Sequence, residues 1–337
     1  MTNFRLALDI PSFPQKINHR HKLFLSGSCF TEHITKQLTN NKFTTLENSN
    51  GILFNPVSIA SSVVSYIEQK RYSEDDLFYY NELWNSWDHH SRFSHPDKQT
   101  ALKQMNDSQQ AAHTFLKQAD WLILTLGSAF VYEWIEKSSP LYTTKNRDTN
   151  IVANCHKVPT DRFRKRLLTT EEVFTVLDNL RYRLMLFNPG IKIIYTISPV
   201  RHARDGLIEN NKSKATLIQA VNNVVEKFEN HFYFPAYELV IDDLRDYRFY
   251  AEDMVHPNYL ATAYVWEKFT AACIDPSCFA LMKEMEKINI AMKHRAFNPT
   301  SAAHRQFLNS HLSKVQALQT QYPFLDFSEE IKHFGGN

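Results

Sequence analysis

The residues best able to do chemistry stand together as Gly27-Ser28-Cys29. The apolar run before them is typical of a buried strand, and the apolar spacing after them is typical of a helix. A hydroxyl and a thiol therefore lie at an expected helix start, where unpaired N–H groups and the helix dipole favour an anion and lower a thiol pKa. Either side chain is a candidate nucleophile. The alternative is an ordinary turn, in which one residue caps the helix and Glu32 completes a capping box.

A second reactive group lies far downstream, in the segment "AEDMVHPNYLA" at residues 251–261. Asp253 and His256 are three positions apart, directly before Pro257 and an expected helix. A nucleophile needs a base, and the base needs a group that fixes its tautomer. On one short loop, Asp253 can reach Nδ1 of His256. The pattern also fits a surface pair at a helix start, and its position after the last expected strand favours catalysis.

The elements that must position these groups follow from the apolar pattern. Short apolar runs predict buried parallel strands at residues 22–27, 121–127, 191–198 and 237–242, with a weaker candidate at 42–47. Helical patterns lie between them, opening at Asn55-Pro56, near residue 99, at Thr169 and at Ser213. This alternation predicts a doubly wound α/β fold with a parallel sheet, in which ligands bind at the carboxyl ends of the strands.

The remaining segments predict the domain organisation. Beyond Pro257 the pattern is only helical, with breaks near Asp275-Pro276 and Asn298-Pro299. We therefore expect an α/β domain over residues 1–274 and a C-terminal helical annex over residues 275–337. A polar, aromatic insertion at about residues 72–118 interrupts the first domain, and its Trp-rich stretch at residues 81–95 is expected to form a lid or a wall beside the site.

Composition excludes several classes of protein. The 337 residues are 43% hydrophobic and 22% charged, and the net charge of +2 argues against nucleic acid or an anionic membrane as partner. Four cysteines are too few for a disulfide framework, and none form a C-x-x-C pair. The N-terminal segment lacks the apolar stretch of a signal peptide, and no run approaches the roughly 18 apolar residues of a membrane helix. We expect a cytoplasmic protein with reduced thiols.

Further candidates lie near these elements. Arg201 and His202 follow the expected strand at 191–198 and are able either to bind an acidic or hydroxylated substrate or to cap a helix. Cys155 and His156 are a second thiol–imidazole pair, but no helix-opening turn precedes them.

The insertion holds a group of potential metal ligands, namely Asp88, His89, His90 and His95. Neighbouring histidines on an extended segment point to opposite faces, which makes them poor ligands of one ion. We therefore expect no metal and no cofactor. Trp84 and Trp87 are candidates to line a groove, although packing is the commoner role of such residues.

Taken together, "GSCFTEH" and the downstream "DMVH" resemble the GSCFA family, which is grouped with the SGNH/GDSL hydrolases. The resemblance extends from about residue 20 to 270 and includes, in the family's order, "NGILFNPVSIA", "LTLGSAFVYEW", "NCHKVP" and "ISPVRHARDG". It implies a flavodoxin-like three-layer α/β/α fold of the SGNH type, with residues 1–274 as the catalytic domain. It also implies ester or acyl-transfer chemistry.

The resemblance implies a role for each motif. The nucleophile's position holds Cys29, with Ser28 as the rival if the motif slips by one residue, and the D-x-x-H block supplies Asp253 and His256. Gly51 corresponds to the glycine whose N–H enters the oxyanion hole.

The third block departs from the superfamily pattern. It normally supplies an oxyanion asparagine in a G-x-N motif, whereas this chain has Gly127-Ser128-Ala129. Asn154 replaces that donor only if its loop folds over the strand edge.

The sequence therefore predicts a hydrolase or acyltransferase acting on an ester, with a carbohydrate O-acetyl group as one candidate substrate. The alternative is a non-catalytic protein that binds a glycan or small ligand on the same scaffold. An enzyme predicts a reactive Cys29 of lowered pKa. A binding protein predicts an unreactive Cys29, with Trp84 and Trp87 governing affinity.

Overall fold

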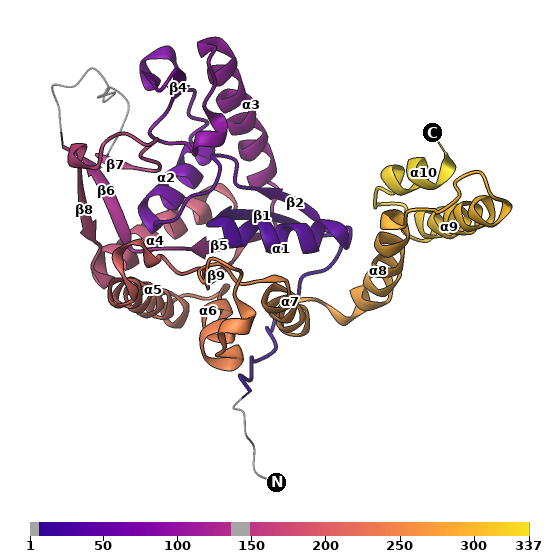
Figure 1. Ribbon diagram of the computed structural model, residues 1–337. Helices are drawn as coiled ribbons and strands as arrows, with labels where there is room; N and C mark the ends of the chain where they lie inside the picture. Colours follow the sequence, from indigo (N-terminus) through magenta and orange to yellow (C-terminus); the bar gives the residue numbers. More distant parts are fainter. Residues whose placement is uncertain (1–6, 136–148, 337) are drawn as a thin grey trace, which may run out of the picture.

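The computed structural model describes residues 7–135 and 149–336, and a five-stranded parallel sheet lies at its centre (Figure 1). The strand order is β10-β9-β5-β1-β2, and every neighbouring pair is parallel. Taken in chain order, these strands have the 2-1-3-4-5 order of flavodoxin-like folds. The strands are β1 (Lys22–Gly27), β2 (Thr44–Glu47), β5 (Trp121–Leu126), β9 (Lys192–Ile197) and β10 (His231–Phe234).

Helices cover both faces of this sheet because successive strand residues point to opposite sides. Phe24 packs with α2 (Pro56–Ile67), α3 (Lys98–Leu116), α4 (Thr170–Phe187) and α5 (Leu207–Lys227). Its neighbours Leu23 and Leu25 pack with α1 (Cys29–Asn40) and α7 (Tyr259–Cys273). The predicted three-layer α/β/α fold is confirmed.

The helix starts predicted at Asn55 and Thr169 are confirmed. Asn55 caps α2 by accepting the N–H of Ser58, and Thr169 and Glu172 form a capping box at the start of α4. Helix α5 begins earlier than its pattern predicted, at Leu207.

The strand predicted at residues 237–242 is wrong. These residues form α6 (Ala236–Glu238) and a π-helical turn (Leu239–Leu244), while the edge strand β10 lies directly before them. Leu239 and Val240 are buried against α7 and the sheet. Such a short apolar run is buried equally well as helix or strand, so its composition does not decide between them.

A second sheet was not predicted. Strands β6 (Phe130–Trp134), β7 (Ile151–Val152) and β8 (Phe163–Leu167) follow β5 and pair in antiparallel fashion. The insertion adds the hairpin of β3 (Phe78–Tyr80) and β4 (Leu83–Asn85), and its Trp87 packs with Trp134 and Phe163 of the second sheet. The rest of the insertion is mostly α3, in agreement with the helix expected from near residue 99.

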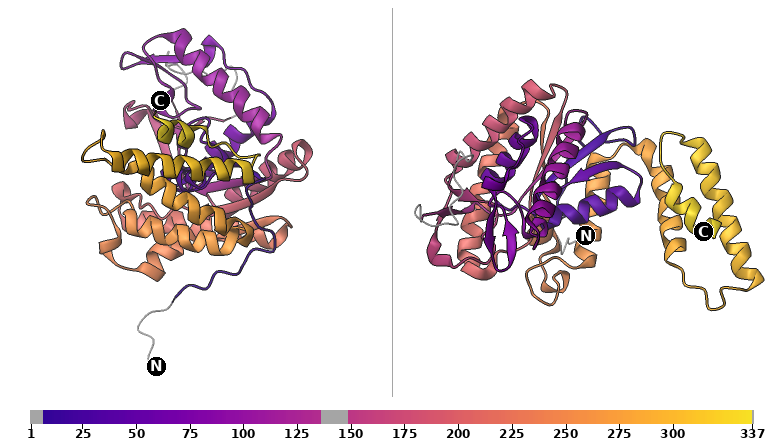
Figure 2. Two further views of the ribbon diagram at one scale, coloured as in Figure 1. Left: turned by 90° about the vertical axis from the view of Figure 1, so that its right-hand side faces the viewer. Right: turned by 90° about the horizontal axis from the view of Figure 1, so that it is seen from above.

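The C-terminal helices gather around a hydrophobic cluster of their own (Figure 2). They are α8 (Phe279–Lys293), α9 (Ala302–Gln321) and α10 (Ser328–Gly335). They meet the end of α1, where Asn289 Nδ2 donates to Asn40 O at 2.8 Å and Lys42 pairs with Glu330 at 2.7 Å. Cys29 begins the same helix at its other end, roughly 17 Å away at 1.5 Å per residue. The predicted boundary at residues 274/275 stays a prediction.

Throughout residues 7–135 and 149–336, every helix is too short or too polar to cross a membrane.

Candidate active site

The turn between β1 and α1 is held by both neighbouring strands. Gly27 has φ +147°, and a Cβ at this position would lie 2.2 Å from Thr125 O of β5, so only glycine fits. Its N–H donates to Asn48 Oδ1 at 2.9 Å, and the N–H of Ser28 donates to Thr125 O at 3.1 Å. The turn is therefore a fixed platform at the carboxyl edge of the sheet.

The two candidate nucleophiles differ in exposure. Ser28 is 1% exposed, and its Oγ is buried without a hydrogen-bond partner among the described residues, whereas Cys29 is partly exposed. Ser28 occupies the N-cap position, but its side chain makes no capping bond. Glu32 pairs instead with Arg92 of the insertion at 2.5 Å, so the capping-box interpretation is wrong. The geometry favours the thiol as the group that a substrate reaches.

The environment of the Cys29 thiol contains opposing influences. Burial raises the pKa of the thiol, and the Glu32 carboxylate adds to this effect. The N–H groups of Cys29 and Phe30 and the ammonium of Lys214 lower the pKa, but they do not outweigh the first two causes. The predicted lowering of the thiol pKa is therefore wrong, because the helix start is itself largely withdrawn from water.

Asp253 and His256 form the expected pair. The Nδ1 of His256 lies 2.6 Å from Asp253 Oδ2, and Asp253 Oδ1 accepts the N–H groups of Val255 and His256 at 2.9 and 3.0 Å. The backbone and side-chain bonds from His256 lower the pKa of Asp253 to about 2. The carboxylate thus stays ionised at neutral pH and holds the imidazole with Nδ1–H toward it.

The loop that carries this pair closes on itself and meets the segment after β9. The N–H of Ala251 donates to His256 O at 2.7 Å, and the N–H of Arg201 donates to Val255 O at 3.2 Å. Burial lowers the pKa of His33 on α1, and the charge of His256 contributes to that lowering. The loop of His256 therefore lies close enough to α1 for its charge to influence His33.

Across the described residues, no hydrogen bond joins the Cys29 thiol to the His256 imidazole. Catalytic hydrogen bonds are often long before substrate binds.

Gly127 and His202 lie beside the turn. A Cβ on Gly127 would lie 3.3 Å from Ser28 Cβ, and the Gly127 N–H donates to Phe54 O at 2.8 Å. The His202 ring packs edge-on to Phe54, with 5.5 Å between ring centroids, and burial lowers its pKa to about 4. A neutral His202 therefore lies at this edge, with Nε2 buried and without a partner among the described residues.

Gly51 and Asn154 do not offer the predicted oxyanion donors. The Gly51 N–H already donates to Asn48 O at 2.6 Å. Gly51 is needed for its φ of +80° and because a Cβ would lie 2.4 Å from His90 Cβ. Asn154 Oδ1 accepts the N–H of His156 at 2.7 Å, within a loop that packs against the insertion.

The remaining candidates are occupied elsewhere. The Arg201 guanidinium stacks on Tyr250, 4.3 Å from the ring centroid, so it supports the loop that leads to His256. Burial raises the pKa of Cys155 to about 11 and lowers that of His156 to about 4. Both groups are neutral at pH 7 and do not form a reactive pair.

The aromatic and histidine residues of the insertion are packed. Trp87 is 2% exposed, and Lys98 covers Trp84 at 4.5 Å from the ring centroid. His89 is fully buried against Tyr72, and burial lowers its pKa to about 3. Within the described part of the chain, no three His, Cys, Asp or Glu side chains are grouped as metal ligands.

Two residues at this edge were missed in the sequence. Lys214 on α5 is 1% exposed, and Asn48, which follows β2, is 3% exposed. The Nδ2 of Asn48 is buried without an acceptor among the described residues. Lys214 had a visible signal, since it shares a helix face with the apolar Leu217 and Val221.

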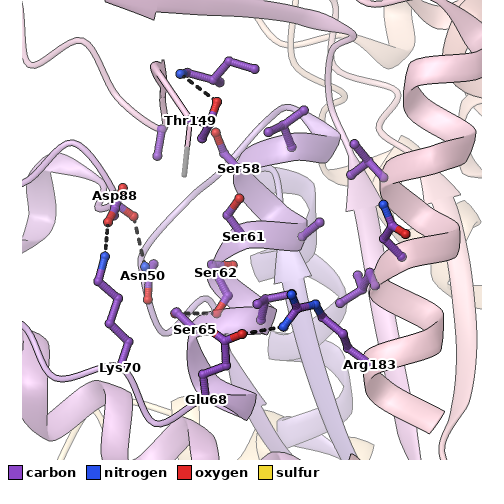
Figure 3. Close-up of a pocket in the computed structure, with 18 of the residues that line it drawn as sticks. Asn50, Ser58, Ser61, Ser62, Ser65, Glu68, Lys70, Asp88, Thr149 and Arg183 are labelled. Atoms are coloured by element: carbon purple, nitrogen blue, oxygen red, sulfur yellow. Dashed lines mark hydrogen bonds and ion pairs between the residues drawn. The ribbon is translucent and has the colours of Figure 1, made fainter. Parts of the chain in front are cut away.

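A pocket of about 700 Å³ lies elsewhere, between α2 and α4 (Figure 3). Lys70 pairs with Asp88 at 2.9 Å on its wall, and Glu68 pairs with Arg183. The serines that α2 presents to it are Ser58, Ser61, Ser62 and Ser65. None of the predicted catalytic residues lines this pocket.

The model of the GSCFA family matches residues 22–269, which contain both the turn at Cys29 and the Asp253–His256 loop. The chain belongs to the GSCFA family. A second model, described as the C-terminal domain of GSCFA domain proteins, matches residues 285–335 of the helical annex. None of the curated proteins matches the chain in sequence.

Two solved structures are similar to it in part. One is a carbohydrate esterase family 3 from Talaromyces cellulolyticus, with 8% identity and a TM-score of 0.35 over 78% of this chain and 99% of that one. The other is the acetyl xylan esterase Est2A from the rumen bacterium Butyrivibrio proteoclasticus, with 11% identity and a TM-score of 0.36 over 83% of this chain and 66% of that one. With TM-scores this low, neither carries an argument about the chemistry of this chain.

Proposed function

We propose that this GSCFA protein is a hydrolase or acyltransferase acting on esters. Cys29 attacks the ester carbonyl, His256 moves the proton and Asp253 orients His256. One observation carries the proposal: the 2.6 Å Asp253–His256 contact lies on a loop close to α1, the helix that begins with the partly exposed Cys29. Nucleophile, imidazole and carboxylate are the groups that acyl transfer requires.

The reaction proceeds in two steps, acylation of Cys29 and deacylation of the resulting thioester. The thiol proton passes to Nε2 of His256 as the sulfur bonds to the carbonyl carbon; the carbon–oxygen bond then breaks, and the leaving alkoxide takes that proton. The resulting thioester on Cys29 is attacked by water, or by an acceptor alcohol in a transferase. His256 takes the proton of the attacking group and returns it to the sulfur, so no cofactor is needed.

The oxyanion is stabilised by donors at the start of α1. The N–H of Cys29 is the first of these, since the first N–H groups of a helix have no acceptor within it. We assign the second donor to Nδ2 of Asn48, whose Oδ1 accepts the N–H of Gly27 in the same turn. This Nδ2 is buried and has no internal acceptor among the described residues, so the substrate has to displace the atoms that cover it. Asn48 would then replace the asparagine that the chain lacks at Ala129. A small O-acyl ester, including a carbohydrate O-acetyl group, is the substrate class that the SGNH resemblance favours.

The test is release of nitrophenol from nitrophenyl acetate by the wild type and by the Cys29→Ala, Ser28→Ala and His256→Ala variants. Cys155→Ala is the matched thiol control. Loss in Cys29→Ala and His256→Ala, with an acetyl adduct on Cys29 by mass spectrometry, would support the thiol mechanism. An adduct on Ser28 would move the nucleophile by one residue.

A non-catalytic binding protein is the second candidate, and the raised pKa of Cys29 favours it. The expectation that Trp87 governs the affinity of such a protein is wrong, because the Trp87 ring is buried and cannot contact a ligand. Turnover that is the same in every variant, with an unreactive Cys29, would favour binding over catalysis.

A further inference from the structure

The pocket between α2 and α4 takes no part in the ester chemistry proposed above. Its volume of about 700 Å³ is within the range of small-molecule sites, roughly 300–1,000 Å³. Helix α2 forms one wall and helix α4 another, and Lys70 and Asp88 line a third side (Figure 3). The chemistry of these walls determines which ligand the pocket can bind.

The α2 wall carries hydroxyl groups. Its four serines, at positions 58, 61, 62 and 65, share one helix face because they are three or four residues apart. Ser62 Oγ donates to Ile59 O at 2.8 Å, and Ser65 Oγ donates to Ser62 O at 2.7 Å. Such bonds to the helix backbone slightly destabilise a helix, so helix stability does not account for these serines.

The α4 wall is mainly apolar. It presents Val176, Leu180, Tyr182 and Leu186 to the pocket. Tyr182 is 54% exposed and Leu186 is 66% exposed, so solvent reaches this wall. Large apolar side chains that stay exposed beside a cavity are typical of a surface that contacts a ligand.

The charges around the pocket have partners of opposite sign. Lys70 pairs with Asp88 at 2.9 Å, and Glu68 pairs with Arg183. A charged ligand would lose hydration on entering, and it would have to compete with a carboxylate or a cation that is already in place. The pocket therefore favours an uncharged ligand.

We propose that the pocket between α2 and α4 is a binding site for a neutral sugar. A pyranose ring carries hydroxyls around its edge and C–H groups on its faces, so it matches one hydroxyl-bearing wall and one apolar wall. Its hydroxyls face the serines of α2, and a C–H face lies on the Tyr182 ring. This inference does not depend on the role of Cys29.

The test measures sugar binding to the full chain by isothermal titration calorimetry and saturation-transfer NMR. The probes are glucose and galactose, their uronic acids, their 2-amino counterparts, and the neutral disaccharides cellobiose and xylobiose. Each acid or amine differs from its parent sugar chiefly in charge. We expect binding of neutral sugars, with the charged counterparts bound more weakly.

Two variants place the sugar in the pocket. Tyr182→Ala removes the apolar platform and should weaken binding about tenfold, the size of one aromatic contact. Ser61→Leu fills the space between the walls and should abolish binding. Met185→Ala and Thr175→Leu are the matched controls, since both residues are exposed on α4 and do not line the pocket. All four substitutions are at exposed positions, and thermal unfolding checks that each variant is folded.

Three results would overturn the proposal. They are no binding of any neutral sugar to the folded wild type, tighter binding of the acids or amines, and binding that is unchanged in both Tyr182→Ala and Ser61→Leu. The last result would place the sugar elsewhere, for example at the Cys29 edge. The measurement uses no ester, so failed ester hydrolysis with intact sugar binding would refute the proposed function and not the assignment of the pocket.

Discussion

The carboxyl edge of the sheet at Cys29 and the pocket between α2 and α4 differ in whether their charged side chains have partners of opposite charge. In the pocket, Lys70 pairs with Asp88 and Glu68 pairs with Arg183, so these charges are balanced within the fold. At the edge, Lys214 is buried without a carboxylate among the described residues. Leaving buried polar groups unmatched costs stability, and such cost concentrates at functional sites. The comparison indicates that buried polar groups without partners, rather than the volume of a pocket, identify the candidate active site.

Among the variants at the Cys29 edge and in the pocket, His256→Ala is expected to lose the most activity. Loss of the base should lower kcat/KM for nitrophenyl acetate on the order of 10²–10⁴-fold, the usual range for general acid–base catalysis. His33→Ala is the matched control because His33 is a second imidazole, on α1, whose pKa the charge of His256 affects, and this variant should retain most activity. Equal losses in the two variants would contradict the assignment of His256 as base.

Asn48→Asp tests the oxyanion donor while keeping an acceptor for the Gly27 N–H. Loss of the Nδ2 donor should lower kcat about 10²-fold, with a smaller change in KM, because an oxyanion forms only in the transition state. Steady-state kinetics of the ester measure both constants. An unchanged kcat would remove Asn48 from the oxyanion hole.

Glu32→Gln should lower the pKa of the Cys29 thiol. The Glu32 carboxylate raises the pKa of Cys29, so its removal stabilises the thiolate and moves the alkylation midpoint to lower pH. A shift of half a unit would speed alkylation at neutral pH roughly threefold. The measurement is the pH profile of iodoacetamide labelling; a midpoint that moves upward would show that loss of the Arg92 contact dominates.

The smallest effect is expected in the pocket itself. Arg183→Ala breaks the pair with Glu68 on the pocket wall but should leave kcat/KM within about twofold, because the pocket contains none of the proposed catalytic residues and an exposed ion pair contributes little to stability. A loss of activity comparable to that of His256→Ala would show that substrate binds in the pocket, and the pocket rather than the Cys29 edge would then be the functional site.

Parts of the molecule that depend on neighbouring residues were predicted well. The central strands at residues 22–27, 121–127 and 191–198, the cap at Asn55 and the box at Thr169 all follow from short-range apolar spacing and helix-end hydrogen bonding. The second sheet was missed because its pairing joins segments that lie far apart in the sequence.

The sequence by itself determined two local features: Cys29 at a glycine turn after a strand, and Asp253 three residues before His256. These features are local, so spacing alone is sufficient to define them. Only the tertiary structure decided the hydrogen bonds, burial and electrostatic surroundings of the residues at the site. In the folded chain the Gly51 N–H donates to Asn48, the Cys29 thiol is partly withdrawn from water, and Lys214 is buried against the carbonyl of Gly127. Burial and charge depend on which distant segments pack together, and the fold alone sets that packing.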